Sequence, residues 1–175
     1  MTTTPSTDQI RLVIASTSTH FDQARGLLAE LETWDCAQVA KLGLDAALAE
    51  TFYYSNGDSP LPGEYGPPDG CLLLALSECD PIGCGAFSRQ ESDICELKRL
   101  YVRESHRGRR IGAEILASLV ARARESNYRL MRLETVRFMT SAIAMYRSVG
   151  FRECREYYEI PESFREITVF MDLHL

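Results

Sequence analysis

An apolar segment at residues 94–103 leads into a turn rich in arginine and glycine, and that turn opens an amphipathic segment at residues 110–126. The first segment predicts a strand, and the second predicts a helix because its apolar residues recur along one stripe. The first N–H groups of a helix have no intrahelical partner and lie at the positive end of its dipole. This strand–turn–helix therefore predicts an α/β chain with an anion site where the helix begins.

The charge pattern favours such a site. Residues 98–110 carry six Lys or Arg and one acid, a local net charge of +5, whereas the whole chain has a net charge of −6. A concentrated positive region on an acidic chain indicates one anionic ligand bound at one place. A solvated basic turn is the alternative explanation for the same arginines. The acidic balance and the lack of a basic face studded with aromatic residues argue against nucleic acid as a partner.

Composition is that of one globular domain. A chain of 175 residues, 45% of them hydrophobic, is long enough for one buried core. The longest clean apolar run, residues 71–76, is far shorter than the ~20 residues that a membrane helix needs. Residues 1–8 are polar and lack the pattern of a signal peptide. We expect a flexible tail at 1–8, a single domain at 9–175, no membrane partner and a cytoplasmic location.

The six cysteines and three histidines do not predict a metal site. No two cysteines have the Cys-x-x-Cys spacing, and no histidine lies near a cysteine at ligand spacing. We therefore expect reduced thiols that pack as small apolar groups.

The remaining pattern predicts alternating strands and helices. Gly83 and Gly85 indicate a bulge or a close backbone approach, Gly150 is a good helix C-cap, and residues 55–70 are a loop dense in Gly and Pro. The expected helices lie near 20–31, 39–52, 110–126 and 141–149, and the expected strands at 10–14, 71–77, 82–89, 94–103, 129–135, 151–158 and 166–173.

Two motifs identify a family that the chain resembles. Residues 107–113, Arg-Gly-Arg-Arg-Ile-Gly-Ala, follow an apolar strand and resemble the acyl-CoA-binding motif of the GCN5-related N-acetyltransferases (GNAT). In that motif Gln or Arg is followed by any two residues, Gly, any residue, and Gly or Ala. Residues 142–151 resemble the family's second motif, Ala-x-x-x-Tyr-x-x-x-Gly-Phe. Both motifs occur in the family's order, and the resemblance covers residues 10–175.

The resemblance implies a mixed, mostly antiparallel sheet flanked by about four helices. The strands at 94–103 and 129–135 would lie parallel and splay apart, with acetyl-CoA as the acyl donor between them. Main-chain groups of the first strand would pair with the pantetheine arm, and N–H groups of the following turn would hold the pyrophosphate. The implied cofactor-binding residues are Leu100, Tyr101, Val102, Arg107, Gly108, Arg109, Arg110, Ile111, Gly112 and Ala113.

Two residues depart from the family pattern. Arg110 stands where the first motif glycine is expected, and we expect it to adopt ordinary helical φ and ψ angles and to add a cation near the phosphates. Met139 stands where relatives often have an asparagine that contacts the cofactor, and Thr140 or Ser141 is the alternative partner.

The resemblance also assigns two catalytic roles. Tyr146 would be the general acid that protonates the departing thiolate, although its helical spacing alone favours a core tyrosine. Glu96 would be the general base, because an amine with a pKa of ~10.4 must lose a proton before it attacks. A structural ion pair with a cation on a neighbouring strand is the alternative role for Glu96.

The acceptor is predicted from charge. Residues 1–97 have a net charge of −11, which favours a cationic primary amine, either a small molecule or a peptide. Glu64, Tyr65 and Tyr157 are candidates for the acceptor pocket; a rigid loop and strand packing are their structural alternatives. The expected assembly is a monomer or a homodimer. The alternative function is a CoA-binding sensor without turnover, which the presence of Tyr146 disfavours.

Overall fold

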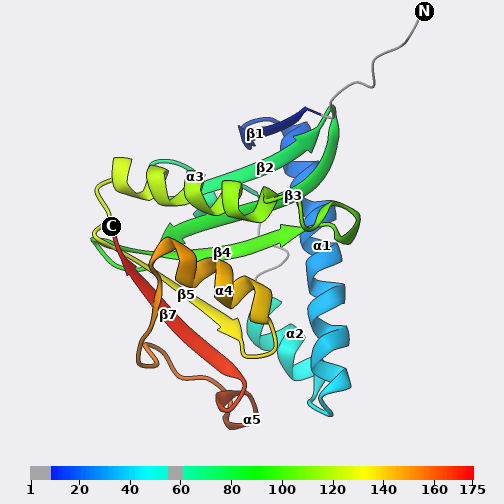
Figure 1. The fold of residues 1–175 in the computed structure, drawn as a ribbon, viewed down its shortest axis with the longest axis vertical. Helices are drawn as coiled ribbons and strands as arrows, with labels where there is room; N and C mark the ends of the chain where they lie inside the picture. The colour runs from blue at the N-terminus through cyan, green and yellow to red at the C-terminus, as the bar shows by residue number, and fades with distance from the viewer. Residues whose placement is uncertain (1–8, 55–60) are drawn as a thin grey trace, which may run out of the picture.

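The computed structural model describes residues 9–54 and 61–175, so the predicted tail at 1–8 and part of the predicted loop at 55–70 lie outside the described residues. In the described residues one sheet has the strand order β1-β2-β3-β4-β5-β7-β6 (Figure 1). The strands are β1 (Ile10–Ile14), β2 (Cys71–Ser77), β3 (Asp80–Arg89), β4 (Ile94–Val102), β5 (Leu130–Val136), β6 (Arg152–Glu153) and β7 (Thr168–His174).

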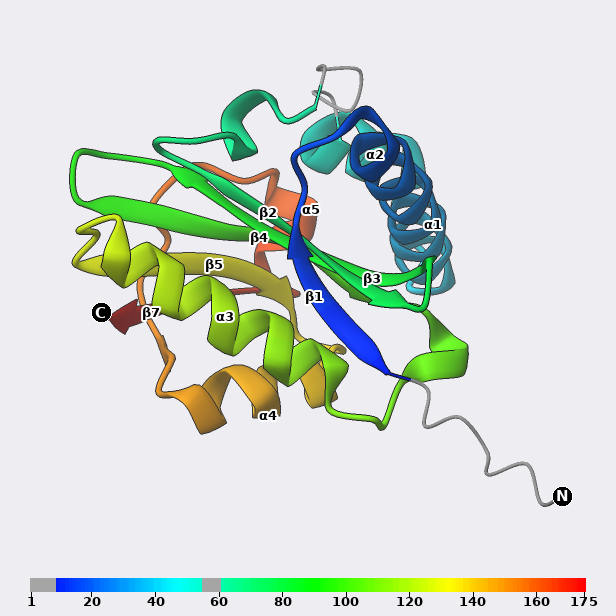
Figure 2. The same cartoon turned by 90° about the horizontal axis from the view of Figure 1, so that it is seen from above.

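Helices cover both faces of this sheet. Figure 2 shows α1 and α2 on one side and α3 and α4 on the other. The helices are α1 (Ser18–Lys41), α2 (Ala46–Tyr54), α3 (Ile111–Glu125), α4 (Thr140–Val149) and the short α5 (Glu162–Arg165), with 3-10 turns at Gly63–Tyr65 and Glu104–His106.

Two apolar layers result from this arrangement. The larger one packs the apolar stripe of α3 and the buried residues of α4 against the sheet. The smaller one packs α1 against the opposite face of β2 and β3. Strand β2 is buried almost throughout because it contributes to both layers.

Only three residue pairs join β4 to β5 in the described residues. Ile94, Cys95 and Glu96 pair with Leu130, Met131 and Arg132 in parallel, and all other strand pairs are antiparallel. Beyond these pairs the two strands diverge (Figure 1). The predicted mixed, mostly antiparallel sheet with a splayed parallel pair is confirmed.

A bulge in β4 lies just beyond this point. The pairing with β3 shifts register between Cys84 and Ala86, and Arg99 on β4 has a φ of 61°. An extra residue in one strand bends that strand locally. Gly85 faces the bulge, and an added Cβ there would lie 2.7 Å from Ile115 Cγ2 on α3. An added Cβ on Gly83 would lie 2.9 Å from the backbone oxygen of Tyr101. The bulge or close backbone approach that the two glycines indicated is thus present in both forms.

The boundary between the first two helices differs from the prediction. Helix α1 runs without interruption to Lys41, whereas the sequence pattern suggested a break before residue 39. No Gly or Pro lies between residues 31 and 39, so nothing in that stretch stops the helix. The chain turns at Gly43, whose φ is 74°, and Asp45 then caps α2 by accepting hydrogen bonds from the N–H groups of Ala47 and Leu48.

The strand predicted at 151–158 is also wrong beyond its start. Strand β6 ends at Glu153, and the chain then leaves the sheet. Tyr157 and Tyr158 both pack edge-on against the ring of Phe170, with centroids 4.8 Å and 5.3 Å away. Successive side chains of a regular strand point to opposite faces, so two adjacent tyrosines on one ring require an irregular backbone.

Candidate active site

A cavity of about 450 Å³ lies where β4 and β5 separate. Residues of both strands form its walls, and α1, α2 and α4 close its sides. The lining residues are Leu31, Asp35, Val39, Ala49, Glu96, Leu97, Lys98, Arg99, Leu100, Leu133, Glu134, Thr135, Val136, Phe138, Met139, Tyr146 and Tyr158.

Strand alternation places the polar groups of this cavity on two sides of the sheet. Leu97 and Leu133 belong to the core layer under α3 and α4, which also holds Tyr146. Their strand neighbours Glu96 and Glu134 therefore point to the other face, which α1 and α2 cover. The cavity thus brings together a phenol on one face of the sheet and two carboxyl groups on the other.

Tyr146 is both a core residue and a wall of the cavity. Its ring is buried on α4 and packs against Phe151, with centroids 5.8 Å apart. Among the described residues its hydroxyl has no hydrogen-bond partner. Burial, and to a smaller extent the charge of Asp35, raises the pKa of Tyr146 above its ordinary value. The phenol therefore holds its proton at neutral pH, as a general acid must.

Glu96 is buried, and two neighbours hold its carboxylate. The Tyr157 hydroxyl donates a hydrogen bond of 3.0 Å to Oε1, and Lys98 Nζ lies 3.3 Å from Oε2. Glu96 therefore has an ion pair, but its partner Lys98 lies two residues along β4 and not on a neighbouring strand as the structural alternative expected. Glu96 also lines the cavity. Tyr157 stands behind Glu96 and is not among the lining residues, whereas its neighbour Tyr158 is.

Glu134 is a second carboxyl group in the cavity, and sequence reasoning missed it. Its carboxylate accepts a hydrogen bond from the Tyr158 hydroxyl. Burial raises the pKa of Glu134 to about 7, and Glu96 adds to this effect, while Tyr158, Lys98 and Arg99 oppose it. A carboxyl group that titrates near neutral pH in a cavity is typical of functional sites.

The turn before α3 contains two residues with left-handed backbone. Gly108 has a φ of 79°, and Arg110, the N-cap of α3, has a φ of 63° and a ψ of 7°. The predicted ordinary helical conformation of Arg110 is therefore wrong. As the N-cap of α3, Arg110 precedes the first residue with helical φ and ψ angles. The turn that connects β4 to α3 gives this residue a positive φ. Arg110 thus keeps the left-handed conformation that a glycine adopts readily.

The first turn of α3 fits an anionic ligand. The first helical hydrogen bond of α3 runs from the N–H of Glu114 to the oxygen of Arg110, so the N–H groups before it lie at the free end of this helix. An added Cβ on Gly112 would meet Met145 Sδ at 3.6 Å and Val102 Cγ2 at 3.7 Å, which are ordinary contacts. Packing within the chain therefore does not require a glycine at position 112. A ligand that approaches the backbone closely would require one.

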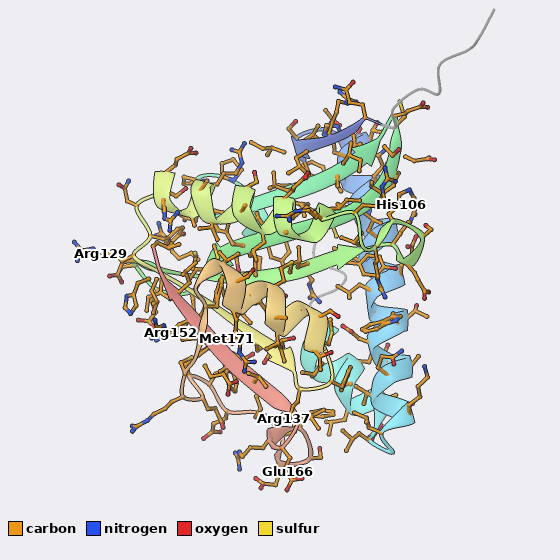
Figure 3. All side chains as sticks on the ribbon, viewed as in Figure 1. His106, Arg129, Arg137, Arg152, Glu166 and Met171 are labelled. Atoms are coloured by element: carbon orange, nitrogen blue, oxygen red, sulfur yellow. The ribbon has the colours of Figure 1, made fainter. Side chains whose placement is uncertain are left out.

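Side chains from α1 hold this turn in place. The guanidinium of Arg107 lies 5.4 Å from the ring centre of Trp34, and its Nε donates a hydrogen bond of 3.0 Å to the Val102 carbonyl. Arg103 makes a bidentate ion pair with Glu30. Figure 3 labels His106 on the same loop between β4 and α3. The loop predicted to bind phosphate is thereby tied to the helix layer on the opposite face.

Other predicted residues lie at or near the cavity. Leu100 lines it, and so does Met139, the residue that departs from the family pattern. Tyr65 is buried in the core under α1, and its hydroxyl accepts a hydrogen bond of 3.4 Å from Arg99 Nε. Glu64 is exposed on the adjacent 3-10 turn. Neither Glu64 nor Tyr65 is among the lining residues, and their role toward an acceptor stays a prediction.

The model of the acetyltransferase (GNAT) family matches residues 37–151. This chain belongs to that family. The family resemblance drawn from the two motifs is therefore confirmed.

Two relatives are named as uncharacterized N-acetyltransferases. The one from Schizosaccharomyces pombe is 34% identical over 113 residues, which are 62% of this chain and 69% of the relative. The one from Dictyostelium discoideum is 44% identical over 70 residues, which are 40% of this chain but 32% of the relative. The chain thus spans about a third of the Dictyostelium protein and about two thirds of the yeast one.

Solved structures share the fold at low sequence identity. An acetyltransferase from Streptococcus agalactiae superposes with a TM-score of 0.70 at 18% identity, over 95% of this chain and 98% of that one. A GNAT family acetyltransferase from Elizabethkingia anophelis, solved with acetyl-CoA bound, gives a TM-score of 0.60 at 18% identity, over 96% and 99%.

Two features are absent from the described residues. No helix in this part of the chain has the length and apolar character needed to cross a membrane. Nor do three His, Cys, Asp or Glu side chains of the described residues gather as metal ligands would.

Proposed function

We propose that this chain is an acetyl-CoA-dependent N-acetyltransferase that acetylates a primary amine by direct attack in a ternary complex. The observation that carries this proposal is the cavity at the separation of β4 and β5, with Tyr146 facing it from one side of the sheet and Glu96 from the other. Direct transfer needs an acid and a base on either side of the reacting atoms, and this arrangement supplies both.

The residues present fit acetyl-CoA as the acyl donor. The free N–H groups at the start of α3, the positive charge of the turn at residues 107–110 and the room left by Gly112 favour the pyrophosphate there. Beyond Glu96 the edge of β4 toward β5 has no strand partner among the described residues, so main-chain groups of Leu100–Val102 are available to the pantetheine arm. The Arg107 contact to the Val102 carbonyl occupies one of these groups.

Each catalytic group has one proton to move. Acetyl-CoA supplies a thioester whose carbonyl carbon forms a bond to the amine nitrogen while its carbon–sulfur bond breaks. The carboxylate of Glu96 takes the proton that the amine loses, directly or through a water molecule. The Tyr146 phenol, which is protonated at neutral pH, gives its proton to the departing thiolate.

A cationic amine is the acceptor that the charges of the cavity favour. Its lining includes the carboxyl groups of Asp35, Glu96 and Glu134 and the cations Lys98 and Arg99. Residues 1–97, which supply α1 and α2 beside the cavity, have a net charge of −11. Negative potential at the entrance raises the encounter rate of cations.

A thiol-release assay with a panel of cationic and anionic amines tests this function. We expect CoA release with cationic primary amines and a kcat/KM that falls when ionic strength rises, because salt screens the attraction. Binding of CoA is measured separately by calorimetry. CoA binding without turnover on any amine would indicate a sensor domain, and no CoA binding at millimolar ligand would contradict the proposal. A preferred anionic acceptor would contradict the charge argument alone.

A further inference from the structure

Glu134 lines the cavity without a cation of its own. Its carboxylate accepts a hydrogen bond from the Tyr158 hydroxyl, which fixes its orientation. Among the described residues no Lys, Arg or His side chain lies within ion-pair distance of it. This sets it apart from Glu96, which Lys98 already pairs.

Both cations of the cavity wall are directed at other groups. Lys98 Nζ lies 3.3 Å from Glu96 Oε2, and Arg99 Nε donates to the Tyr65 hydroxyl at 3.4 Å. Their charges act on Glu134 only from a distance, and they do not cancel the cost of its burial, because its pKa stays raised to about 7. A half-buried carboxyl group in this situation either keeps a proton or binds a cation from outside.

The position of Glu134 relates it to the proposed base. Glu96 is directly opposite Arg132 in the last paired step of β4 and β5. Glu134 lies two residues further along β5 on the same face, where the strands have begun to separate. The two carboxyl groups therefore face one cavity, Glu96 from β4 and Glu134 from β5.

Apolar residues line the space beside these carboxyl groups. Leu31 and Val39 come from α1 and Ala49 from α2, on the face of the sheet that Glu96 and Glu134 also face. Such a wall suits a methylene chain, and Asp35 on α1 adds a third carboxyl group to the lining beside Glu96 and Glu134. An acceptor with one ammonium group at Glu96 and a short hydrocarbon spacer would place a second cationic group at Glu134.

We propose that Glu134 is a specificity-determining residue that binds a second cationic group of the acceptor, so that the preferred substrates are linear diamines or polyamines. This inference rests on the proposed function, because it concerns the acceptor of that same reaction. It assigns Glu134 to substrate binding and leaves proton removal to Glu96.

The test compares putrescine with butylamine, which has the same carbon chain and one amine. Steady-state kinetics are measured for the unmodified protein, for Glu134→Gln and for Glu125→Gln, a control that neutralises an exposed carboxylate on α3. We expect Glu134→Gln to raise the KM for putrescine by about tenfold or more, the loss of one charge-assisted contact. The kcat for putrescine and both constants for butylamine should change little, and Glu125→Gln should resemble the unmodified protein.

Two kinetic results would overturn the inference. An equal fall of kcat for both amines in Glu134→Gln would make Glu134 the base instead of an anchor. Unchanged constants for both amines would leave it without a role in the acceptor site. Thermal unfolding of each variant establishes that the comparison is made between folded proteins.

Calorimetric binding of putrescine in the presence of CoA separates this inference from the proposed function, because it needs no turnover. Putrescine binding that Glu134→Gln weakens supports the anchor even if no amine is acetylated. Acetylation of amines without any preference of the unmodified protein for putrescine over butylamine, in kinetics and in binding, would refute the anchor and leave the proposed function standing.

Discussion

Tyr157 donates a hydrogen bond of 3.0 Å to Oε1 of Glu96, although the two residues are 61 positions apart in sequence. The same carboxylate has Lys98 at its other oxygen. The ring of Tyr157 is itself held by Phe170 on β7 and by the guanidinium of Arg132, 4.8 Å from the ring centre. The orientation of the proposed base thus depends on the segment that leaves the sheet after β6.

Removing the Tyr157 hydroxyl should therefore slow the reaction without abolishing it. One hydrogen bond to a charged carboxylate contributes ~1.5 kcal/mol, so Tyr157→Phe should lower kcat by about tenfold. Glu96→Gln should lower it by ~10²-fold or more, because the base itself is lost. Steady-state kinetics check both variants. If Glu96→Gln is as active as the unmodified protein, Glu96 has only its structural ion pair.

Tyr146→Phe should lower kcat by ~10²-fold and leave the affinity for CoA nearly unchanged. Since the hydroxyl has no hydrogen-bond partner among the described residues, the free energy of unfolding should change by less than about 0.5 kcal/mol. Kinetics, CoA titration and urea unfolding measure the three quantities. If Tyr146→Phe has a normal kcat while the chemical step limits the rate, Tyr146 serves core packing alone.

The left-handed conformation of Arg110 gives a testable stability difference. Arg110→Gly and Arg110→Ala remove the same charge, so both should weaken CoA binding by similar factors at low salt. Only glycine relieves the left-handed backbone, which costs other residues ~1–2 kcal/mol. Glycine also loses ~0.5–1 kcal/mol through greater freedom in the unfolded chain. Urea unfolding should show Arg110→Gly to be at least as stable as Arg110→Ala, and a clearly less stable glycine variant would contradict this reasoning.

Gly108 allows charge and backbone effects to be separated in the same turn. Its φ is 79°, and an added Cβ would meet no atom within 4 Å. Gly108→Ala and Gly108→Glu should therefore lose similar stability from the backbone alone. Glutamate should weaken CoA binding further, because it places a carboxylate beside the pyrophosphate. Equal CoA affinity of the two variants in calorimetry would remove this turn from the phosphate site.

Glu134 should make the protein less stable as pH rises toward neutral. Its pKa is raised from 4.5 to about 7 by burial first and by Glu96, against the effects of Tyr158, Lys98 and Arg99. The native state then binds more protons than the unfolded state between these values, so the free energy of unfolding falls as pH rises through that window. Glu134→Gln should remove this fall. Urea unfolding at pH 4 and pH 8 measures it, and identical pH profiles of the two proteins would disprove the assignment.

Much of the fold could be predicted because its signals are local. Gly150 ends α4 with a φ of 113°, and Thr17 caps α1 by accepting a hydrogen bond from the N–H of His20. The apolar stripe of α3 packs in the larger core layer as its periodicity indicated. Each of these features depends on a few neighbouring residues, which is the information that a single sequence carries.

The remaining site residues depend on contacts between distant segments. Glu134 sits in a strand of alternating residues, where a polar position usually faces water. Nothing near it in sequence shows that α1, α2 and Tyr158 cover that face. The same holds for the hydrogen bond from Tyr157 to Glu96 on β4, because it forms only through the path that the chain takes after β6. Such groups become visible only once the tertiary structure brings them together.

The three residue pairs that join β4 to β5 are the only strand pairing between two parts of the sheet in the described residues. One part is β1–β4 and the other is β5, β7 and β6, and both parts contribute to the core layer under α3 and α4. A ligand bound between the diverging strands would contact both parts of the sheet at the end where no strand pairing joins them. Cofactor binding should therefore reduce local opening in both parts of the sheet. We expect slower amide hydrogen exchange in β5 and β7 as well as in β4, the strand that the ligand touches.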